Sequence, residues 1–172
     1  MTNYLLSIDP SIKNTGFTLW EKENISDNFI IRWKPIFVKS YNLKKYDGQR
    51  KFYWDIKVND NELDLIIERG TFHSKNGIGY ETQEHLRGFI AGQFNKLLTK
   101  NMLISPSEWK KWYKNRPFGA YWDIKNEKWT KETSLAMAQI IISENEWDFN
   151  ITNHDEADSL LIGWYYLNKE KK

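Results

Sequence analysis

The sequence of 172 residues contains no cysteine, which excludes disulfides, thioether-linked haem and thiolate metal sites. It also lacks a basic secretory leader in residues 1–9 and any apolar run of membrane-spanning length. Internal repeats, low-complexity tracts and Gly/Ser-rich linkers are missing as well, so no domain boundary is predicted. We therefore expect one soluble cytoplasmic domain over residues 1–172, with no membrane partner.

The net charge of +2 understates how basic the surface is, because four acids that we expect to cluster are subtracted from 25 Lys and Arg. Two basic stretches are interleaved with Tyr or Trp, a combination suited to phosphate contact and base stacking. A charge run is also the ordinary composition of a solvated face, and this alternative stays open for the first stretch. The first stretch holds Lys39, Lys44, Lys45, Arg50, Lys51 and Lys57, and the second holds Lys110, Lys111, Lys114, Arg116, Lys125, Lys128 and Lys131.

The second stretch is the stronger indication of nucleic-acid binding, because we expect much of it to form a loop. Four of its aromatic residues flank Gly and Pro among polar neighbours. They either form a wedge that enters nucleic acid or pack the loop onto the body of the protein. These residues are Trp112, Phe118, Tyr121 and Trp122.

Two apolar segments end in an acid. Residues 4–8 lead to Asp9, which precedes Pro10, and proline disfavours a helical conformation at the residue before it. Residues 63–67 lead in the same way to Glu68. If the two strands are neighbours, both carboxylates lie at one edge of the sheet. Taken alone, Asp9 and Pro10 are also ordinary turn residues.

A second pair of acids, Asp155 and Asp158, precedes the apolar segment 160–167. A separation of three places both on one face of a helix, which can face the strand acids. The alternative is that they complement the positive end of the helix dipole, with Asn153 or Asp155 as the cap. His154 beside them is a candidate ligand or proton shuttle, or a surface residue.

Four clustered carboxylates repel one another unless a cation neutralises them, and Mg²⁺ and Mn²⁺ prefer such oxygen ligands. Two such ions can activate water and stabilise a leaving oxygen in phosphodiester hydrolysis. The pattern therefore predicts a divalent-metal site with Mg²⁺ as cofactor, for which Mn²⁺ may substitute. Its ligands are Asp9, Glu68, Asp155 and Asp158.

The pattern of apolar residues predicts an α/β fold with a mixed five-stranded sheet flanked by helices. An initial meander of strands is followed by alternating helices and strands. The expected strands are 3–9, 15–22, 28–38, 63–68 and 102–105, and the expected helices lie within 43–58 and at 80–99, from about 107, 130–145 and 155–168. The stripe of apolar residues along 80–99 packs either on the sheet or on a second subunit.

Residues 6–17, with Asp9-Pro10 and Thr15-Gly16, resemble the opening strands of RuvC-type Holliday-junction resolvases. Residues 154–160 resemble the final motif of that family, an Asp-x-x-Asp that opens the last helix. Between these ends, Phe72, Lys75, Asn76, Arg87 and Gly88 fall where RuvC carries the same residues. The resemblance spans residues 4–168, and the compact size is similar to that of RuvC variants from bacteriophages.

The resemblance implies an RNase H-like fold, a homodimer and Mg²⁺-dependent cutting of branched DNA. Asp9, Glu68, Asp155 and Asp158 would be catalytic metal ligands, and Lys131 would hold the scissile phosphate. Phe72 would enter the junction and unstack bases. Residues 109–130 depart from the cellular enzymes, which favours a selectivity broader than four-way junctions, including three-way and forked DNA. The expected DNA contacts are Phe72, Lys75, Arg87, Lys110, Lys111, Lys114 and Arg116.

Two other functions remain open from the sequence. The first is a junction-binding protein on the same fold whose chemistry is weak or lost, against which stands the presence of all four acids. The second is a nucleotide site of the sugar-kinase or actin type, since residues 9–16 faintly resemble the first phosphate loop of that superfamily. Such proteins need two domains, whereas this length accommodates one.

Overall fold

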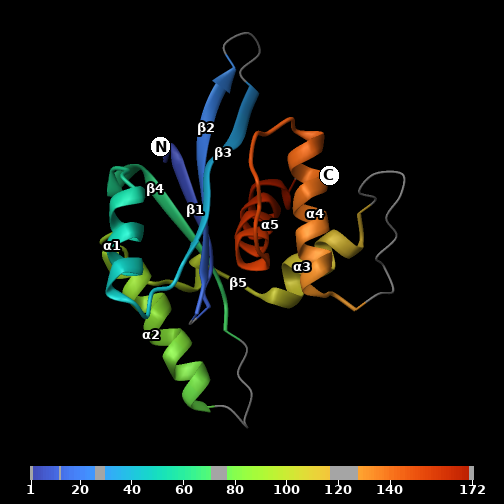
Figure 1. Ribbon diagram of the computed structural model, residues 1–172. Coiled ribbons are helices and arrows are strands. Elements are labelled where there is room, and N and C mark those ends of the chain that lie inside the picture. The colour runs from blue at the N-terminus through green and yellow to red at the C-terminus, as the bar shows by residue number, and fades with distance from the viewer. Residues whose placement is uncertain (1, 12, 26–29, 71–76, 117–127, 171–172) are drawn as a thin grey trace.

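The computed structural model describes residues 2–11, 13–25, 30–70, 77–116 and 128–170 (Figure 1). Its centre is a five-stranded sheet in the order β3-β2-β1-β4-β5. β1 runs antiparallel to β2 and parallel to β4, so the sheet is mixed as predicted. The strands are β1 (Tyr4–Asp9), β2 (Thr15–Ile25), β3 (Ile30–Tyr41), β4 (Leu63–Glu68) and β5 (Leu103–Ile104).

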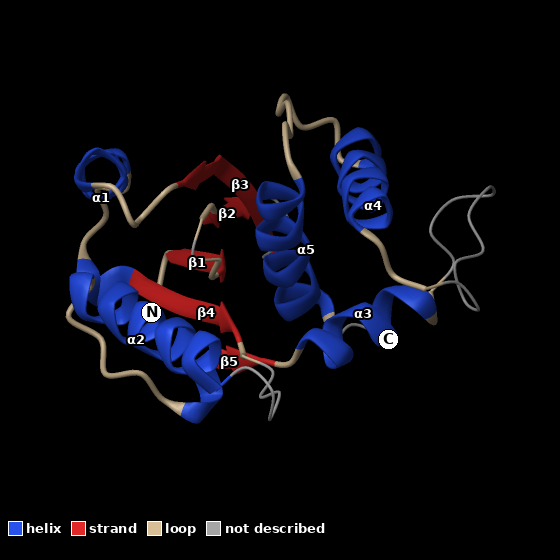
Figure 2. Cartoon of the chain, turned by 60° about the horizontal axis from the view of Figure 1, so that its bottom comes forward, coloured by secondary structure: helices blue, strands red, loops and turns tan. Residues whose placement is uncertain are grey.

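Helices cover both faces of the sheet, with α1 and α2 on one side and α3, α4 and α5 on the other (Figures 1 and 2). No helix among the described residues is long and apolar enough to cross a membrane. The α-helices are α1 (Tyr46–Asp55), α2 (Gly77–Gln93), α3 (Pro106–Lys114), α4 (Lys131–Glu144) and α5 (His154–Asn168), and 3-10 turns span Asp60–Glu62 and Lys100–Met102.

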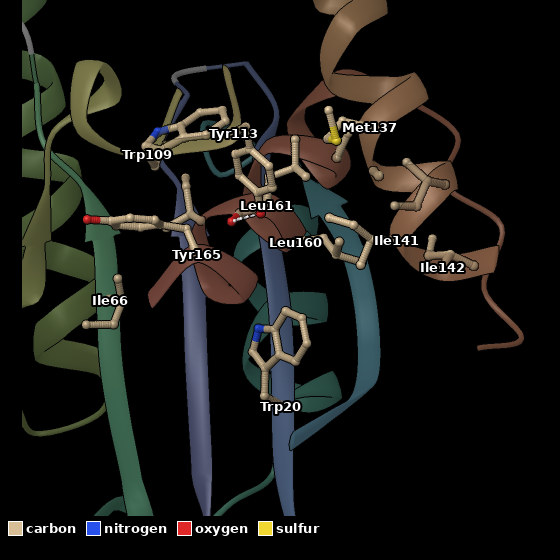
Figure 3. Close-up of a cluster of buried hydrophobic side chains, with 14 of the residues drawn as sticks. Trp20, Ile66, Trp109, Tyr113, Met137, Ile141, Ile142, Leu160, Leu161 and Tyr165 are labelled. Carbon is tan, nitrogen blue, oxygen red and sulfur yellow. Dashed lines mark hydrogen bonds between the residues drawn. The ribbon is translucent and has the colours of Figure 1, made fainter. Parts of the chain in front are cut away.

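Successive residues of β1 point to opposite faces of the sheet, and both faces are buried. Leu6 and Ile8 belong to the core beneath α1 and α2. Leu5 belongs to the second core, which α3, α4 and α5 build from Trp109, Leu160 and other residues (Figure 3). Burial on both faces explains why the strand reads as a continuous apolar run rather than an alternating one.

The helix predicted over 80–99 ends earlier, because α2 stops at Gln93. Asn95 has a φ of 53°, the amide of Lys96 donates to the carbonyl of Ala91, and the amide of Asn95 donates to that of Gly92. This is a Schellman termination with asparagine at the left-handed position. Leu97 lies beyond it and is exposed, while Ile90 and Phe94 face the core, so most of the apolar stripe packs on the sheet.

Buried polar contacts fix α5 on the strands. The Ser7 hydroxyl donates to the carbonyl of Ser159 (2.7 Å) and accepts a hydrogen bond from Trp20 Nε1 (2.9 Å). Gly163 leaves room for this contact, because a Cβ there would lie 2.2 Å from Trp20 Nε1 and 2.5 Å from Ser7 Oγ. The helix therefore lies unusually close to β1 and β2.

Ser7→Ala should lower the free energy of unfolding by about 1–3 kcal/mol, because it leaves the buried Trp20 N–H and the Ser159 carbonyl without their partner. Urea denaturation followed by circular dichroism measures the change. Ser143→Ala, at an exposed position of α4, is the control and should shift stability by less than about 0.5 kcal/mol. Equal midpoints for the two variants would contradict the assigned role of Ser7.

Candidate functional site

Asp9 and Glu68 lie side by side at one edge of the sheet. Each ends its strand, and the parallel register of β1 and β4 pairs Ile8 with Ile67 immediately before them. Asp9 shares the face of Ser7, and Glu68 shares the face of Ile66, which packs beneath α3, α4 and α5. The predicted adjacency of the two strand ends is therefore present, and both acids face the α5 side.

The opening turn of α5 reaches the same edge. Gly16, the register partner of Asp9 on β2, touches this turn so closely that a Cβ would lie 1.9 Å from the carbonyl oxygen of Asp155. Asn153 is the helix cap, since its Oδ1 accepts from the amides of Asp155 (3.1 Å) and Glu156 (3.0 Å). Of the two caps that the sequence offered, Asn153 is therefore confirmed and Asp155 is not.

The four carboxyl groups act on one another electrostatically. Burial raises the pKa of Asp9 well above its ordinary value, and the charges of Glu68, Asp158 and Asp155 raise it further. Burial likewise raises the pKa of Glu68 to about 7, although Lys110 and a hydrogen bond from Trp109 oppose the shift. Burial also raises the pKa values of Asp155 and Asp158. This edge of the sheet therefore concentrates acids in a place that disfavours their ionisation.

Asp158 carries an unsatisfied atom, because its Oδ1 is buried without a hydrogen-bond partner among the described residues. A buried carboxylate oxygen without a donor is costly, and a cation satisfies it. Hard oxygen donors from four carboxylates are also what Mg²⁺ or Mn²⁺ would select. Across the described ranges, however, no group of three or more Asp, Glu or His side chains is arranged as a ready metal site. The chemistry of these donors fits a divalent cation.

Two lysines lie close enough to the acids to act on them electrostatically. Lys110, on α3, lowers the pKa values of Asp9, Glu68 and Asp158 by its charge, and Lys131, at the start of α4, lowers that of Asp155. The structure places Lys131 at the first residue of α4, and its role at a phosphate stays a prediction. The sequence predicted only a DNA contact for Lys110. In the structure its charge also acts on the carboxyl groups of Asp9, Glu68 and Asp158. His154 Nε2 lies 3.4 Å from Asp155 Oδ1 at the same site.

Arg87 lies inside the protein rather than on a DNA-facing surface. It is 2% exposed, its Nε donates to the carbonyl of Glu68 (2.8 Å), and its guanidinium pairs with Glu84 (2.9 Å). Burial lowers the pKa of Arg87, while the charges of Glu84 and Glu68 oppose that shift. This position favours a role in holding the end of β4 over the predicted direct contact with DNA.

Sequence reasoning missed Trp109 as a site residue. Its indole Nε1 donates to Glu68 Oε2 at 2.8 Å, and the ammonium of Lys110 lies 4.8 Å from its ring centroid. The available signal was chemical, since a buried tryptophan needs an acceptor for its N–H and an acid ends the neighbouring strand. Figure 3 shows Trp109 above Tyr165 and next to Tyr113, whose hydroxyl donates to the carbonyl of Leu161.

The first basic residues of the second stretch lie on the short helix that was expected from about residue 107. Lys111 and Lys114 belong to α3, and Arg116 follows it with its guanidinium 4.0 Å from the ring centroid of Trp112. Trp112 packs edge-on against Tyr113 and Tyr165, so the packing interpretation holds for it. The remaining predicted contacts lie outside the described residues, namely Phe72, Lys75, Phe118, Tyr121, Trp122 and Lys125.

The sequence matches no protein-family model and no curated protein. Solved structures do match over nearly the whole chain. The fowlpox virus resolvase in complex with Holliday junction DNA superposes with a TM-score of 0.54 and 21% identity, covering 98% of this chain and 99% of that one. RuvC from T. thermophilus, in complex with a Holliday junction substrate, gives 0.50 and 10% identity over 95% of each chain. The chain therefore has the RNase H-like fold of these resolvases, as the motifs predicted.

Proposed function

We propose that this protein is a metal-dependent endonuclease that cuts branched DNA by phosphodiester hydrolysis. One observation carries the proposal: Asp9, Glu68, Asp155 and Asp158 meet at one sheet edge of a fold shared with two resolvases that were solved with Holliday junctions. A buried acidic cluster costs stability in the absence of a ligand, so its presence favours a binding role.

The four carboxylates would hold Mg²⁺, or Mn²⁺ in its place. Such ions, when bound, lower the pKa of water and stabilise the charge on a leaving oxygen. Asp9 is the most central acid, since the charges of all three others raise its pKa. Oδ1 of Asp158, which lacks a partner among the described residues, is available as a ligand atom.

Lys110 and Lys131 would neutralise the DNA phosphate at the cutting point. Both already act on the carboxylates, Lys110 from the α3 side and Lys131 from the start of α4. A phosphodiester that enters this acidic site meets strong repulsion unless cations surround it. The two lysines therefore complement the metal, and Lys111, Lys114 and Arg116 extend the basic surface along α3 for the flanking strand.

A homodimer would place two such sites across a junction and allow paired nicks on opposing strands. The outer face of α2 supports this part of the proposal. There, Phe89 is 38% exposed and borders a hollow of about 260 Å³ lined also by His85, Leu86 and Leu43. Light scattering of the protein alone and with one junction would report the stoichiometry.

The proposal is tested by incubating the protein with labelled four-way, three-way, forked and linear duplex DNA in Mg²⁺ or Mn²⁺. We expect nicking of branched forms before linear duplex, and no nicking in EDTA. Asp155→Asn is the inactive comparison, and Asp64→Asn, an exposed acid on β4, is the matched control that should cut as the wild type does. Tight junction binding without cleavage in either metal would overturn the nuclease assignment in favour of a junction-binding protein.

A further inference from the structure

Two tryptophans lie against each other beside the acidic site. Trp109, on α3, is fully buried, and Trp129 precedes α4. Their ring centroids are 5.2 Å apart with an interplanar angle of 85°, an edge-to-face contact. The indole N–H of Trp109 donates to Glu68, and the indole N–H of Trp129 donates to Ser134, which influences Asp158.

The first indole holds Glu68 directly. An indole N–H can only donate, and that of Trp109 donates to Glu68 Oε2 at 2.8 Å. Arg87 Nε binds the backbone carbonyl of the same residue at 2.8 Å. Both the main chain and the side chain of Glu68 are therefore restrained by hydrogen bonds.

The second indole acts through a serine. Trp129 Nε1 donates to Ser134 Oγ at 2.8 Å, so the hydroxyl oxygen is the acceptor and its own proton remains to be donated. Ser134 is 1% exposed, and its hydroxyl lowers the pKa of the Asp158 carboxyl. Oδ1 of Asp158 has no hydrogen-bond partner in the described part of the chain.

We propose that Trp109 and Trp129 are positioning residues of the acidic site. Trp109 holds one oxygen of Glu68 and leaves the other for a ligand, while Trp129 binds Ser134 and packs edge-on against the Trp109 ring, which supports its orientation. This inference rests on the proposed metal-dependent function, and it adds the residues that orient one of the metal ligands. The edge contact between the rings fixes the two supports relative to each other.

The test is Mn²⁺ binding in the absence of DNA, measured by electron paramagnetic resonance for the wild type and Trp109→Phe. Phenylalanine keeps an aromatic ring and removes only the donor and some volume. Loss of a residue that orients a metal ligand typically weakens metal binding by about 10- to 100-fold, which is the expected result. Junction affinity in EDTA should not change, which a general loss of structure would not allow.

Trp147→Phe is the matched control. Trp147 is also buried, but its Nε1 has no hydrogen-bond partner among the described residues, and its ring packs against Trp20 and Trp164 away from the acids. It should bind Mn²⁺ as the wild type does. Trp129→Phe and Ser134→Ala should each weaken binding, and the two changes combined should not add, because they break one chain of contacts.

The NMR signal of the Trp109 indole N–H tests the positioning role independently of whether the protein binds a metal. In the wild type, the Trp109 signal should exchange slowly with solvent and move when Glu68 is replaced by Gln. Absence of Mn²⁺ binding by the wild type would refute the proposed metal site, and the indole signal would still decide whether Trp109 holds Glu68. If the wild type binds Mn²⁺ and Trp109→Phe binds it equally well, the positioning role is overturned.

Discussion

Asp9→Asn is expected to lower the rate of junction cleavage by about 1000-fold or more, which corresponds to roughly 4 kcal/mol in the activation barrier. Asp9 is the acid on which the charges of Glu68, Asp158 and Asp155 all act, so it lies at the centre of the site. If the proposed metal site is correct, neutralising Asp9 removes a ligand that the other three acids cannot replace. Single-turnover cleavage of a labelled four-way junction in Mg²⁺ measures the loss.

The same substitution should leave junction affinity unchanged and should stabilise the metal-free protein. The half-buried Asp9 carboxylate is held among like charges, and an amide removes that repulsion. We expect a gain on the order of 1 kcal/mol at neutral pH. Asp64→Asn on the same sheet should change neither rate nor stability. A variant that cuts at more than a tenth of the wild-type rate would exclude Asp9 from the chemistry.

The metal-free protein is expected to lose stability as the pH rises from about 4 to about 8. Burial raises the folded-state pKa of Glu68 from 4.5 to about 7, and it raises those of Asp9, Asp155 and Asp158 as well. Between the unfolded and folded pKa values, the folded state binds more protons than the unfolded state. The protonated acids therefore stabilise the folded protein fully at a pH below their unfolded-state pKa. This stabilisation is lost as the pH rises through their folded-state pKa.

Glu68 alone accounts for roughly 3 kcal/mol of this loss, since one pKa unit corresponds to about 1.4 kcal/mol. Saturating Mg²⁺ should restore part of the stability lost at high pH, because a ligand at about 100 times its dissociation constant adds about 2.7 kcal/mol. Urea denaturation in EDTA and in Mg²⁺ across this pH range measures both effects. The double variant Asp9→Asn, Glu68→Gln is the control, and its stability should vary much less with pH. A flat wild-type profile would mean that the acids are not buried together.

The strand-end acids could be predicted because their positions follow from local pattern. An apolar run followed by Asp-Pro, or by Glu, indicates where a strand stops, and a spacing of three places Asp155 and Asp158 on one helix face. That the ends of β1 and β4 are adjacent required the parallel pairing, which the sequence alone left conditional.

Contacts between distant residues could not be predicted in this way. Trp109 and Glu68 are far apart in the sequence, and no local sequence pattern predicts that the two side chains are in contact. Arg87 was predicted to contact DNA from the family resemblance, yet the backbone carbonyl of Glu68 and the acid Glu84 hold it inside the protein. The end of α2 was missed because asparagine, rather than glycine, takes the left-handed position at residue 95.

The close contact between Gly16 and the first turn of α5 has a consequence for how the protein is made. The acidic site joins side chains from the first strand, from the middle of the chain and from a helix near its end. A chain still emerging from the ribosome holds Asp9 and Glu68 but not Asp155 and Asp158. Since a domain completes its packing as a unit, such a chain has no assembled site. The proposed nuclease would therefore be harmless to DNA during its own synthesis and become active only when its last helix settles onto the sheet.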